Sequence, residues 1–332
     1  MPSPQKIIDI ANAFYQSQTL FSASDLGVFA KLAELGSADA PTLARALELN
    51  PRGAELLLNA CAAIGLLEKD GASFRNSPDA AAFLVPGGRG DLSKAIRYNR
   101  DVYAAWGKAG EFARTGKPVE KPEIHLGDDP ARTRAFALSM HGRAMAIGQM
   151  VVPLLKLDGC RNLLDVGGGP GAYATLIARA NPGITCWTLD LPAISAIAAE
   201  LVAATEVADR VKTLAGDYHT AEFRNGMDAV IFFGVLHQES PEMISTLFRR
   251  AYGCLRPGGK IYVMDMMTDA SGTAPEFSAL FALNMALTTE NGWVFSDDSL
   301  KAWLAGAGFT DFQVRPLPAP MPHWLASATK EG

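Results

Sequence analysis

Short apolar runs alternate with helical runs through the second half of the chain, and this alternation limits the fold more than any other feature. The runs typical of strands cover residues 162–166, 184–189, 211–214, 228–233 and 260–264. The helical runs between them cover residues 171–180, 192–204 and 241–255. Strands separated by helices predict an α/β fold with a parallel sheet, because a parallel connection needs a long crossover. Two late strands, at 309–314 and 324–328, have no helix between them and are expected to pair antiparallel.

The first 90 residues are rich in Ala and Leu and show helical periodicity. Apolar positions between residues 14 and 32 suit one or two helices with a wide buried stripe. A further helix is expected to begin at Pro51 and to end near Gly65. Residues 66–74 then predict a hairpin with a turn at Asp70-Gly71. The order helix, turn, helix, hairpin is the winged-helix pattern.

A winged helix suggests nucleic-acid binding, but the charge of the chain argues against this function. The net charge is −5, from 30 basic and 35 acidic residues. The helix after Pro51 carries one Arg near its start and then mostly Leu and Ala, whereas a groove-reading helix needs polar side chains for base edges and cations for phosphates. We therefore predict that this segment serves dimerisation, with the stripe at 14–32 buried against a second subunit.

The connecting segment reads as helices interrupted by a Pro/Gly-rich stretch at residues 116–130. One long helix is expected from residue 132 to residue 157. Phe136, Met140 and His141 on it are candidates for the wall of a substrate pocket where two domains meet, since Phe136 and Met140 are spaced to share a face. The predicted organisation is a dimerisation domain at 1–95, a helical linker at 96–158 and a catalytic domain at 159–332.

The chain shows no membrane or metal signature. No apolar run approaches the ~20 residues that span a bilayer, and no signal peptide is recognisable at the start, so a cytoplasmic location is expected. The four cysteines are widely spaced without a Cys-x-x-Cys pair, which predicts no zinc cluster and no disulfide framework. No metal is expected in the site.

A glycine loop follows the strand at 162–166. Asp165 lies two residues before Gly167, and the spacing Gly167-x-Gly169-x-Gly171 opens a helix. Such a loop lets a ligand approach the backbone closely. The spacing Gly167-x-Gly169-x-x-Ala172 also matches a dinucleotide fingerprint, but a pyrophosphate-binding loop would gain nothing from the negative charge of Asp165.

Two further carboxylates follow the next strands. Asp190 ends the second strand, where a carboxylate can accept both hydroxyls of an adenosine ribose. Asp217 follows the third strand, before Tyr218, where a carboxylate can accept from an adenine amino group. Together with Asp165 and the glycine loop, these residues favour S-adenosylmethionine (SAM) over a nicotinamide cofactor, although a nicotinamide oxidoreductase stays an alternative.

With these motifs the chain resembles the class I SAM-dependent methyltransferases, and among them the small-molecule O-methyltransferase family of plants and bacteria. The resemblance rests also on residues 136–140, 256–260 and 302–309 and covers essentially the whole chain. It implies a Rossmann-like seven-stranded sheet with an N-terminal winged-helix dimerisation domain, and a homodimer whose N-terminal domains interlock. It also implies that Leu191, Tyr218 and Phe233 join the cofactor site.

The same resemblance makes His237 the general base, because His237 occupies the position of the family histidine after the fourth strand. Asp265 matches the carboxylate that family members carry on strand five. The family triplet His-Asp-Trp is His237-Gln238-Glu239 here, and the second family carboxylate is missing, with Glu290 as a substitute nearby.

The resulting prediction is methyl transfer from SAM to a hydroxyl of a small molecule, with His237 as base. One alternative is an S- or N-methyltransferase that works by proximity without a base. Another, of a different class, is a ligand-sensing regulator with a winged helix. A metal-dependent catechol-type methyltransferase is disfavoured, since no convergent cluster of Asp and Asn follows from the spacing.

Overall fold

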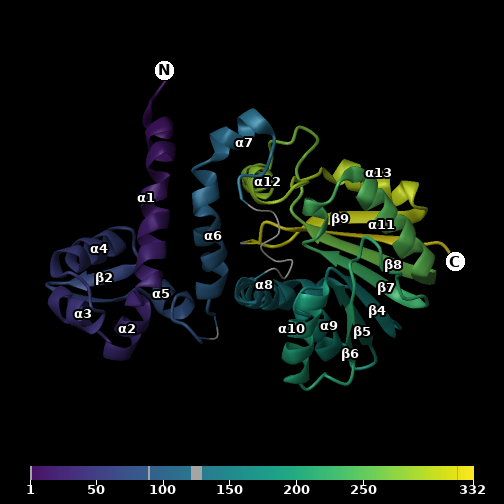
Figure 1. Ribbon diagram of the computed structural model, residues 1–332, viewed down its shortest axis with the longest axis horizontal. Helices are drawn as coiled ribbons and strands as arrows, with labels where there is room; N and C mark the ends of the chain where they lie inside the picture. Colours follow the sequence, from purple (N-terminus) through teal and green to yellow (C-terminus); the bar gives the residue numbers. More distant parts are fainter. Residues whose placement is uncertain (1, 89, 121–128, 320) are drawn as a thin grey trace. The chain divides into compact units, whose positions relative to one another are not determined.

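The computed structural model describes residues 2–332 apart from residues 89, 121–128 and 320 (Figure 1). The chain forms two compact units, Met1–Asp101 and Val102–Gly332. The boundaries expected at residues 95 and 158 stay a prediction. The part of the Pro/Gly-rich stretch at residues 121–128 lies outside the described residues.

The N-terminal unit has the predicted winged-helix order. Its helices are α1 (Gln5–Asp25), α2 (Val28–Leu35), α3 (Ala40–Ala46), α4 (Pro51–Ala63) and α5 (Pro78–Phe83), followed by α6 (Ser93–Trp106). Its sheet has the order β1-β3-β2, with β1 (Ala38–Asp39), β2 (Leu67–Asp70) and β3 (Ser73–Asn76). Side chains cap these helices, for example Asn50, which accepts from the backbone N–H of Gly53 at 3.1 Å. Gly65 ends the α4 region with φ +80°, a conformation that favours glycine.

The apolar stripe of residues 14–32 divides into two parts, which corrects the expectation that all of it faces a second subunit. Its C-terminal part packs inside its own unit, where Phe21, Val28, Phe29 and Leu32 are buried. Leu26 is exposed after α1, and within α1 only the N-terminal half keeps large apolar side chains exposed. These are Ile7, Ile8, Ile10, Phe14 and Tyr15.

A seven-stranded sheet forms the centre of the C-terminal unit and confirms the predicted fold class. Its order is β6-β5-β4-β7-β8-β10-β9. The strands are β4 (Asn162–Val166), β5 (Thr185–Asp190), β6 (Val211–Ala215), β7 (Met227–Phe233), β8 (Leu255–Asp265), β9 (Phe309–Pro316) and β10 (Trp324–Lys330). The five strands from β6 to β8 are parallel, whereas β10 pairs antiparallel with both β8 and β9, as expected.

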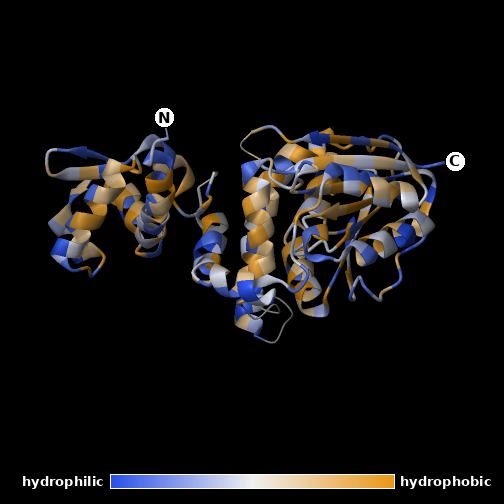
Figure 2. Ribbon diagram, turned by 90° about the horizontal axis from the view of Figure 1, so that it is seen from above, coloured by the Kyte–Doolittle hydropathy of each residue, from blue (hydrophilic) through white to orange (hydrophobic). Residues whose placement is uncertain are grey.

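Helices flank this sheet, and most carry both hydrophobic and hydrophilic residues (Figure 2). The helices of this unit are α7 (Ala109–Thr115), α8 (Pro130–Val151), α9 (Ala172–Ala180), α10 (Pro192–Ala203), α11 (Pro241–Cys254), α12 (Glu276–Thr288) and α13 (Asp297–Gly306). The helix expected to continue to residue 157 ends as α8 at Val151 and passes into a 3₁₀ turn at Val152–Leu154. Pro153 accounts for this, because proline has no N–H for the α-helical hydrogen bond. No helix among the described residues is long and apolar enough to cross a membrane.

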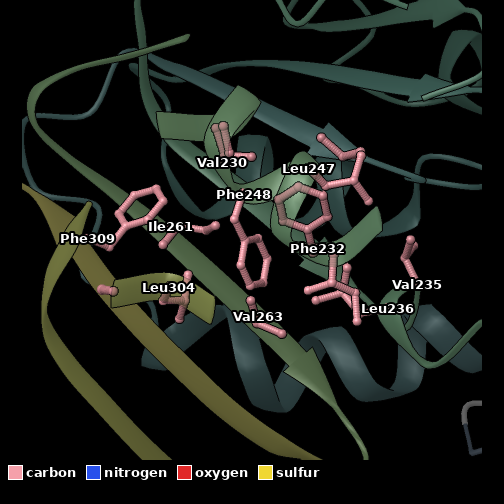
Figure 3. Close-up of a cluster of buried hydrophobic side chains, with 14 of the residues drawn as sticks. Val230, Phe232, Val235, Leu236, Leu247, Phe248, Ile261, Val263, Leu304 and Phe309 are labelled. Carbon is pink, nitrogen blue, oxygen red and sulfur yellow. The ribbon is translucent and has the colours of Figure 1, made fainter. Parts of the chain in front are cut away.

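Buried side chains fill both faces of the sheet. On one face, residues of β7 and β8 pack against α11 and α13, where the rings of Phe232 and Phe248 meet edge to face at 5.7 Å (Figure 3). On the other face, Leu163, Ile177 and Ile231 pack with residues of α8 and α9. A sheet buried on both faces is held rigid, and so are the loops at its carboxyl edge.

We expect Phe248→Ala to destabilise the C-terminal unit by about 3–5 kcal/mol, because the substitution leaves a cavity under a fully buried ring. Urea unfolding followed by tryptophan fluorescence measures this unit alone, since all five tryptophans lie after residue 101. Phe277→Ala is the matched control, because Phe277 is 49% exposed and its loss should cost less than ~1 kcal/mol. Equal effects of the two substitutions would contradict the packing described here.

Candidate active site

The loops that follow β6, β5, β4, β7 and β8 lie in a row, because these parallel strands are neighbours in the sheet. The carboxyl edge of an open α/β sheet is where such folds bind ligands. Asp217, Asp190 and the glycine loop after Asp165 follow the first three of these strands, His237 follows β7, and Asp265 ends β8. The predicted cofactor residues therefore occupy one half of this edge and the predicted catalytic pair occupies the other.

The glycine loop after β4 leaves no room for a side chain at Gly167 or Gly168. A Cβ on Gly167 would lie 2.4 Å from Cγ2 of Val235, and a Cβ on Gly168 would lie 2.0 Å from Oγ1 of Thr188. Gly167 also has φ +67°, which L side chains rarely adopt. At Gly169, by contrast, a Cβ would meet nothing within 4 Å, so the backbone at this position borders open space.

The Asp190 carboxylate is held in a defined orientation at the end of β5. Its Oδ2 accepts from the backbone N–H of Gly169 at 2.7 Å, and its Oδ1 accepts from the N–H of Leu191 at 2.8 Å. Burial raises the pKa of Asp190, and these two hydrogen bonds oppose the rise. Each oxygen keeps a lone pair, so the carboxylate can accept from a diol.

Asp165 lies beneath the glycine loop rather than on its surface. The residue is 1% exposed, and its Oδ2 and the nearby Oγ1 of Thr188 are buried without a hydrogen-bond partner. Burial, and then the charge of Asp190, raise the pKa of Asp165 to about 8. The Asp165 carboxyl is therefore mainly protonated at neutral pH.

The Asp217 carboxylate after β6 is tied to a histidine that sequence reasoning missed. Its Oδ1 lies 2.7 Å from Nδ1 of His219 and accepts from the His219 backbone N–H at 2.8 Å. The second ring nitrogen of His219 lies 2.9 Å from Oε2 of the buried Glu239. The signal was present in the sequence, since a histidine two residues after a loop carboxylate can turn back on it.

His237 and Asp265 form a close pair at the ends of β7 and β8. The His237 Nδ1 lies 2.7 Å from Oδ1 of the fully buried Asp265, and the His237 backbone N–H donates to Oδ2 at 3.3 Å. A carboxylate opposite Nδ1 favours the tautomer with the proton on Nδ1, which leaves a lone pair on Nε2. Phe281 packs edge to face on the imidazole at 5.3 Å.

A second histidine near this pair, His323, was also missed. It precedes β10, whose Trp324 is the register partner of Asp265. His323 is 6% exposed, and its Nδ1 is buried without a partner. Burial lowers the pKa of His323 to about 4, with the charges of Arg143 and His237 acting in the same direction. His323 is therefore neutral at physiological pH.

The remaining predicted residues occupy varied positions. Phe136, Met140 and His141 are half-buried on α8, and Phe233 is buried in β7 with its ring 5.1 Å from that of Tyr173. Glu290 follows α12 and is exposed, unlike Asp265, so its part in catalysis stays a prediction. Within the described ranges, no three His, Cys, Asp or Glu side chains are grouped as a metal site would require.

Comparison with known proteins identifies the family. A model described as an O-methyltransferase domain matches residues 116–310, and a model described as an O-methyltransferase dimerisation domain matches residues 8–86. The chain belongs to the O-methyltransferase family. It is a SAM-dependent methyltransferase, as the resemblance in the sequence indicated.

Two curated relatives in this family show the range of acceptors. The chain is 30% identical to the 3-hydroxy-5-methyl-1-naphthoate 3-O-methyltransferase of Streptomyces sahachiroi, over 98% of this chain and 95% of that protein. It is also 30% identical to an N,N-dimethyltransferase of Streptomyces rimosus, over 98% and 96%. Among solved structures, human N-acetylserotonin methyltransferase in complex with SAM has a TM-score of 0.89 and 26% identity, over 99% of this chain and 97% of that one.

We expect Asp165→Asn to reduce the loss of unfolding free energy between pH 5.5 and pH 8.5. The raised pKa means that the folded state holds a proton that the unfolded state, with an ordinary carboxyl, has already lost. Asp165 therefore lowers stability as the pH rises from about 4 to its folded pKa of about 8. Urea unfolding at the two pH values should show a loss smaller by roughly 3 kcal/mol in the variant. The exposed Asp209, changed to Asn, should leave the difference as in the parent.

Proposed function

We propose that this methyltransferase transfers the methyl group of SAM to a hydroxyl of a small molecule, with His237 as general base. The observation that carries the proposal is the 2.7 Å contact between Nδ1 of His237 and the buried Asp265 carboxylate. A histidine paired in this way at the carboxyl edge of the sheet has its other nitrogen available for a substrate proton.

The cofactor half of the proposal rests on the glycine loop and two carboxylates. Asp190 would accept from the ribose hydroxyls, and Asp217 would accept from the adenine amino group. Gly167 and Gly169 would provide the close backbone approach, with Leu191, Tyr218 and Phe233 beside them. The fit is supported by the open space at Gly169, where a Cβ would meet nothing within 4 Å, and by the fixed orientation of the Asp190 carboxylate.

SAM supplies an electrophilic methyl carbon, so the residues of the chain have to orient the acceptor and remove its proton. With SAM bound, Nε2 of His237 would take the proton of the acceptor hydroxyl while the methyl group passes from the sulfonium sulfur to the oxygen, which breaks the S–CH₃ bond and leaves S-adenosylhomocysteine. Asp265 holds the ring orientation and stabilises the imidazolium. Because Asp265 is fully buried beside this ring, its charge acts on His237 through a medium of low polarity.

The base assignment predicts that His237→Ala lowers turnover by about 10²-fold or more, with little change in SAM affinity. Asp190→Ala should show the reverse pattern and weaken SAM binding by about 2–4 kcal/mol, because the ribose loses a charged acceptor. Calorimetry with SAM and initial rates with a panel of phenols, thiols, thioethers and amines measure both effects. A loss near tenfold in His237→Ala, with a rate independent of pH, would instead favour a sulfur acceptor that has no proton to remove.

We further propose a homodimer formed through the N-terminal unit. The match to a dimerisation domain at residues 8–86 supports it. So does the exposed apolar face of α1, where Ile7, Ile10 and Phe14 follow the spacing of one helix face. A helix that keeps such side chains in water is expected to bury them against a partner of matching chemistry.

For the dimer, we expect the double variant Ile7→Glu and Ile10→Glu to be monomeric. Two carboxylates at the centre of an apolar contact would have to be desolvated without a partner. Light scattering at micromolar concentration should give half of the parent mass. Leu56→Glu is the control, since Leu56 is 58% exposed on α4, and it should leave the parent mass unchanged. A monomeric parent protein would refute the proposal.

A further inference from the structure

His219 lies between two carboxylates that come from different loops. Its Nδ1 is 2.7 Å from Oδ1 of Asp217 in the loop after β6, and its Nε2 is 2.9 Å from Oε2 of Glu239 in the loop after β7. The His219 side chain is 38% exposed, whereas the Glu239 side chain is 6% exposed. The imidazole thus bridges a half-exposed carboxylate and a buried one.

This geometry suits only one charge state of the ring when both carboxyls are ionised. A neutral imidazole has one N–H and one lone pair. In that state a lone pair would face a carboxylate oxygen across one of the two contacts. The imidazolium has a donor on each nitrogen and satisfies both.

The surroundings of the ring favour this protonated form. Burial lowers the pKa of His219, but the contacts with Glu239 and Asp217 outweigh it, so that the pKa of His219 is raised. Tyr218 packs on the ring at 4.6 Å between centroids. From α11, Arg250 donates to the carbonyl oxygens of Tyr218 and His219 at 2.6 and 3.1 Å.

Glu239 extends the bridge to the loop that carries His237. Its Oε1 accepts from the hydroxyl of Tyr218 at 2.5 Å, and its backbone carbonyl accepts from the indole N–H of Trp293 at 2.7 Å. Gln238 donates to the same Tyr218 hydroxyl at 3.1 Å. Gln238 and Glu239 are the two positions at which the sequence departs from the His-Asp-Trp triplet, and both have their partners in the loop of Asp217.

We propose that His219 is a positioning residue of the methyltransferase site, which as an imidazolium orients the Asp217 carboxylate and ties its loop to the loop of His237. The inference rests on the proposed function, which assigns Asp217 to the adenine of SAM. With Oδ1 of Asp217 engaged by the ring and the backbone N–H of His219, the other carboxylate oxygen is fixed for the cofactor.

Cofactor affinity should then depend on pH through His219. The folded pKa is raised, so the contribution of the imidazolium is present at low pH and is lost as the pH rises through that pKa. Above it, one of the two contacts breaks and the orientation of Asp217 relaxes. The affinity should fall from pH 6 towards pH 8.5.

The test is calorimetric titration of the full-length protein with S-adenosylhomocysteine at pH 6.0, 7.0 and 8.5. In the parent protein we expect the Kd to rise about tenfold over this range. In His219→Gln the Kd should be about tenfold higher than in the parent at pH 6.0 and should vary less than threefold with pH, because a single amide donor cannot satisfy both carboxylates. His237→Gln is the matched control, and it should keep the pH dependence of the parent.

A second variant tests the bridge from its other end. In Glu239→Gln the amide can donate to Nε2 of a neutral His219 while its oxygen still accepts from Tyr218. The Kd at pH 8.5 should therefore stay close to the value at pH 6.0. Steady-state rates should show a larger effect of His219→Gln on the KM for SAM than on kcat, which a loss of folding alone would not produce.

The outcomes separate this inference from the function on which it rests. A parent protein that binds no S-adenosylhomocysteine at any pH would refute the assignment of the cofactor site. A parent that binds, together with a His219→Gln variant whose Kd and pH dependence match it, would overturn the role of His219 alone. Tryptophan fluorescence melts of each variant establish that the C-terminal unit is folded at all three pH values.

Discussion

The parallel pairing of β4 with β5 and β7, and of β7 with β8, is the constraint on which the site depends. These pairings bring residues that are up to 100 positions apart to one edge of one sheet, such as Asp165 and Asp265. The two faces of the sheet are filled by separate apolar clusters, so that strand register cannot slip without exposing a core. The loops at this edge are therefore held rigidly, and the rigid sheet sets the distances between their carboxylates and histidines.

Burial changes the protonation of the carboxyls at this edge more than ion pairing does. Three carboxyls lie at or next to the carboxyl ends of their strands, those of Asp165, Asp190 and Asp265. Burial raises the pKa of the first two. Asp265 is satisfied by His237 and by the backbone N–H of Met266 at 2.9 Å.

We propose different tasks for two loop histidines, and these tasks follow from their partners. His237 has one carboxylate, on its Nδ1 side, and so its other nitrogen can exchange a proton with a substrate. His219 has a carboxylate at each nitrogen and is engaged on both sides. The first arrangement suits acid–base chemistry, and the second suits positioning.

Much of this protein was predictable from local patterns in the sequence. The alternation of strands and helices, the hairpin of β2 and β3, the glycine loop and the carboxylates at strand ends all depend on residues close together in the chain, whose conformational preferences are local. The hairpin turn itself is Gly71-Ala72, one residue later than expected, because Asp70 still pairs with Ser73. The resemblance to the O-methyltransferases followed from the same motifs. The end of α8 before Pro153 was predictable in principle, since the missing N–H is a property of the residue itself.

Only the tertiary structure decided which side chains meet. The contacts of His219 with Glu239, and the approach of His323 to the edge of β8, join segments that are 20 or more residues apart, and nothing in either segment alone specifies the other. The burial that raises the pKa of Asp165 and lowers that of His323 depends on the packing of the whole unit. The sequence determined the elements and the chemical groups at their ends, whereas long-range packing determined their distances and protonation, because burial and register exist only once the sheet has formed.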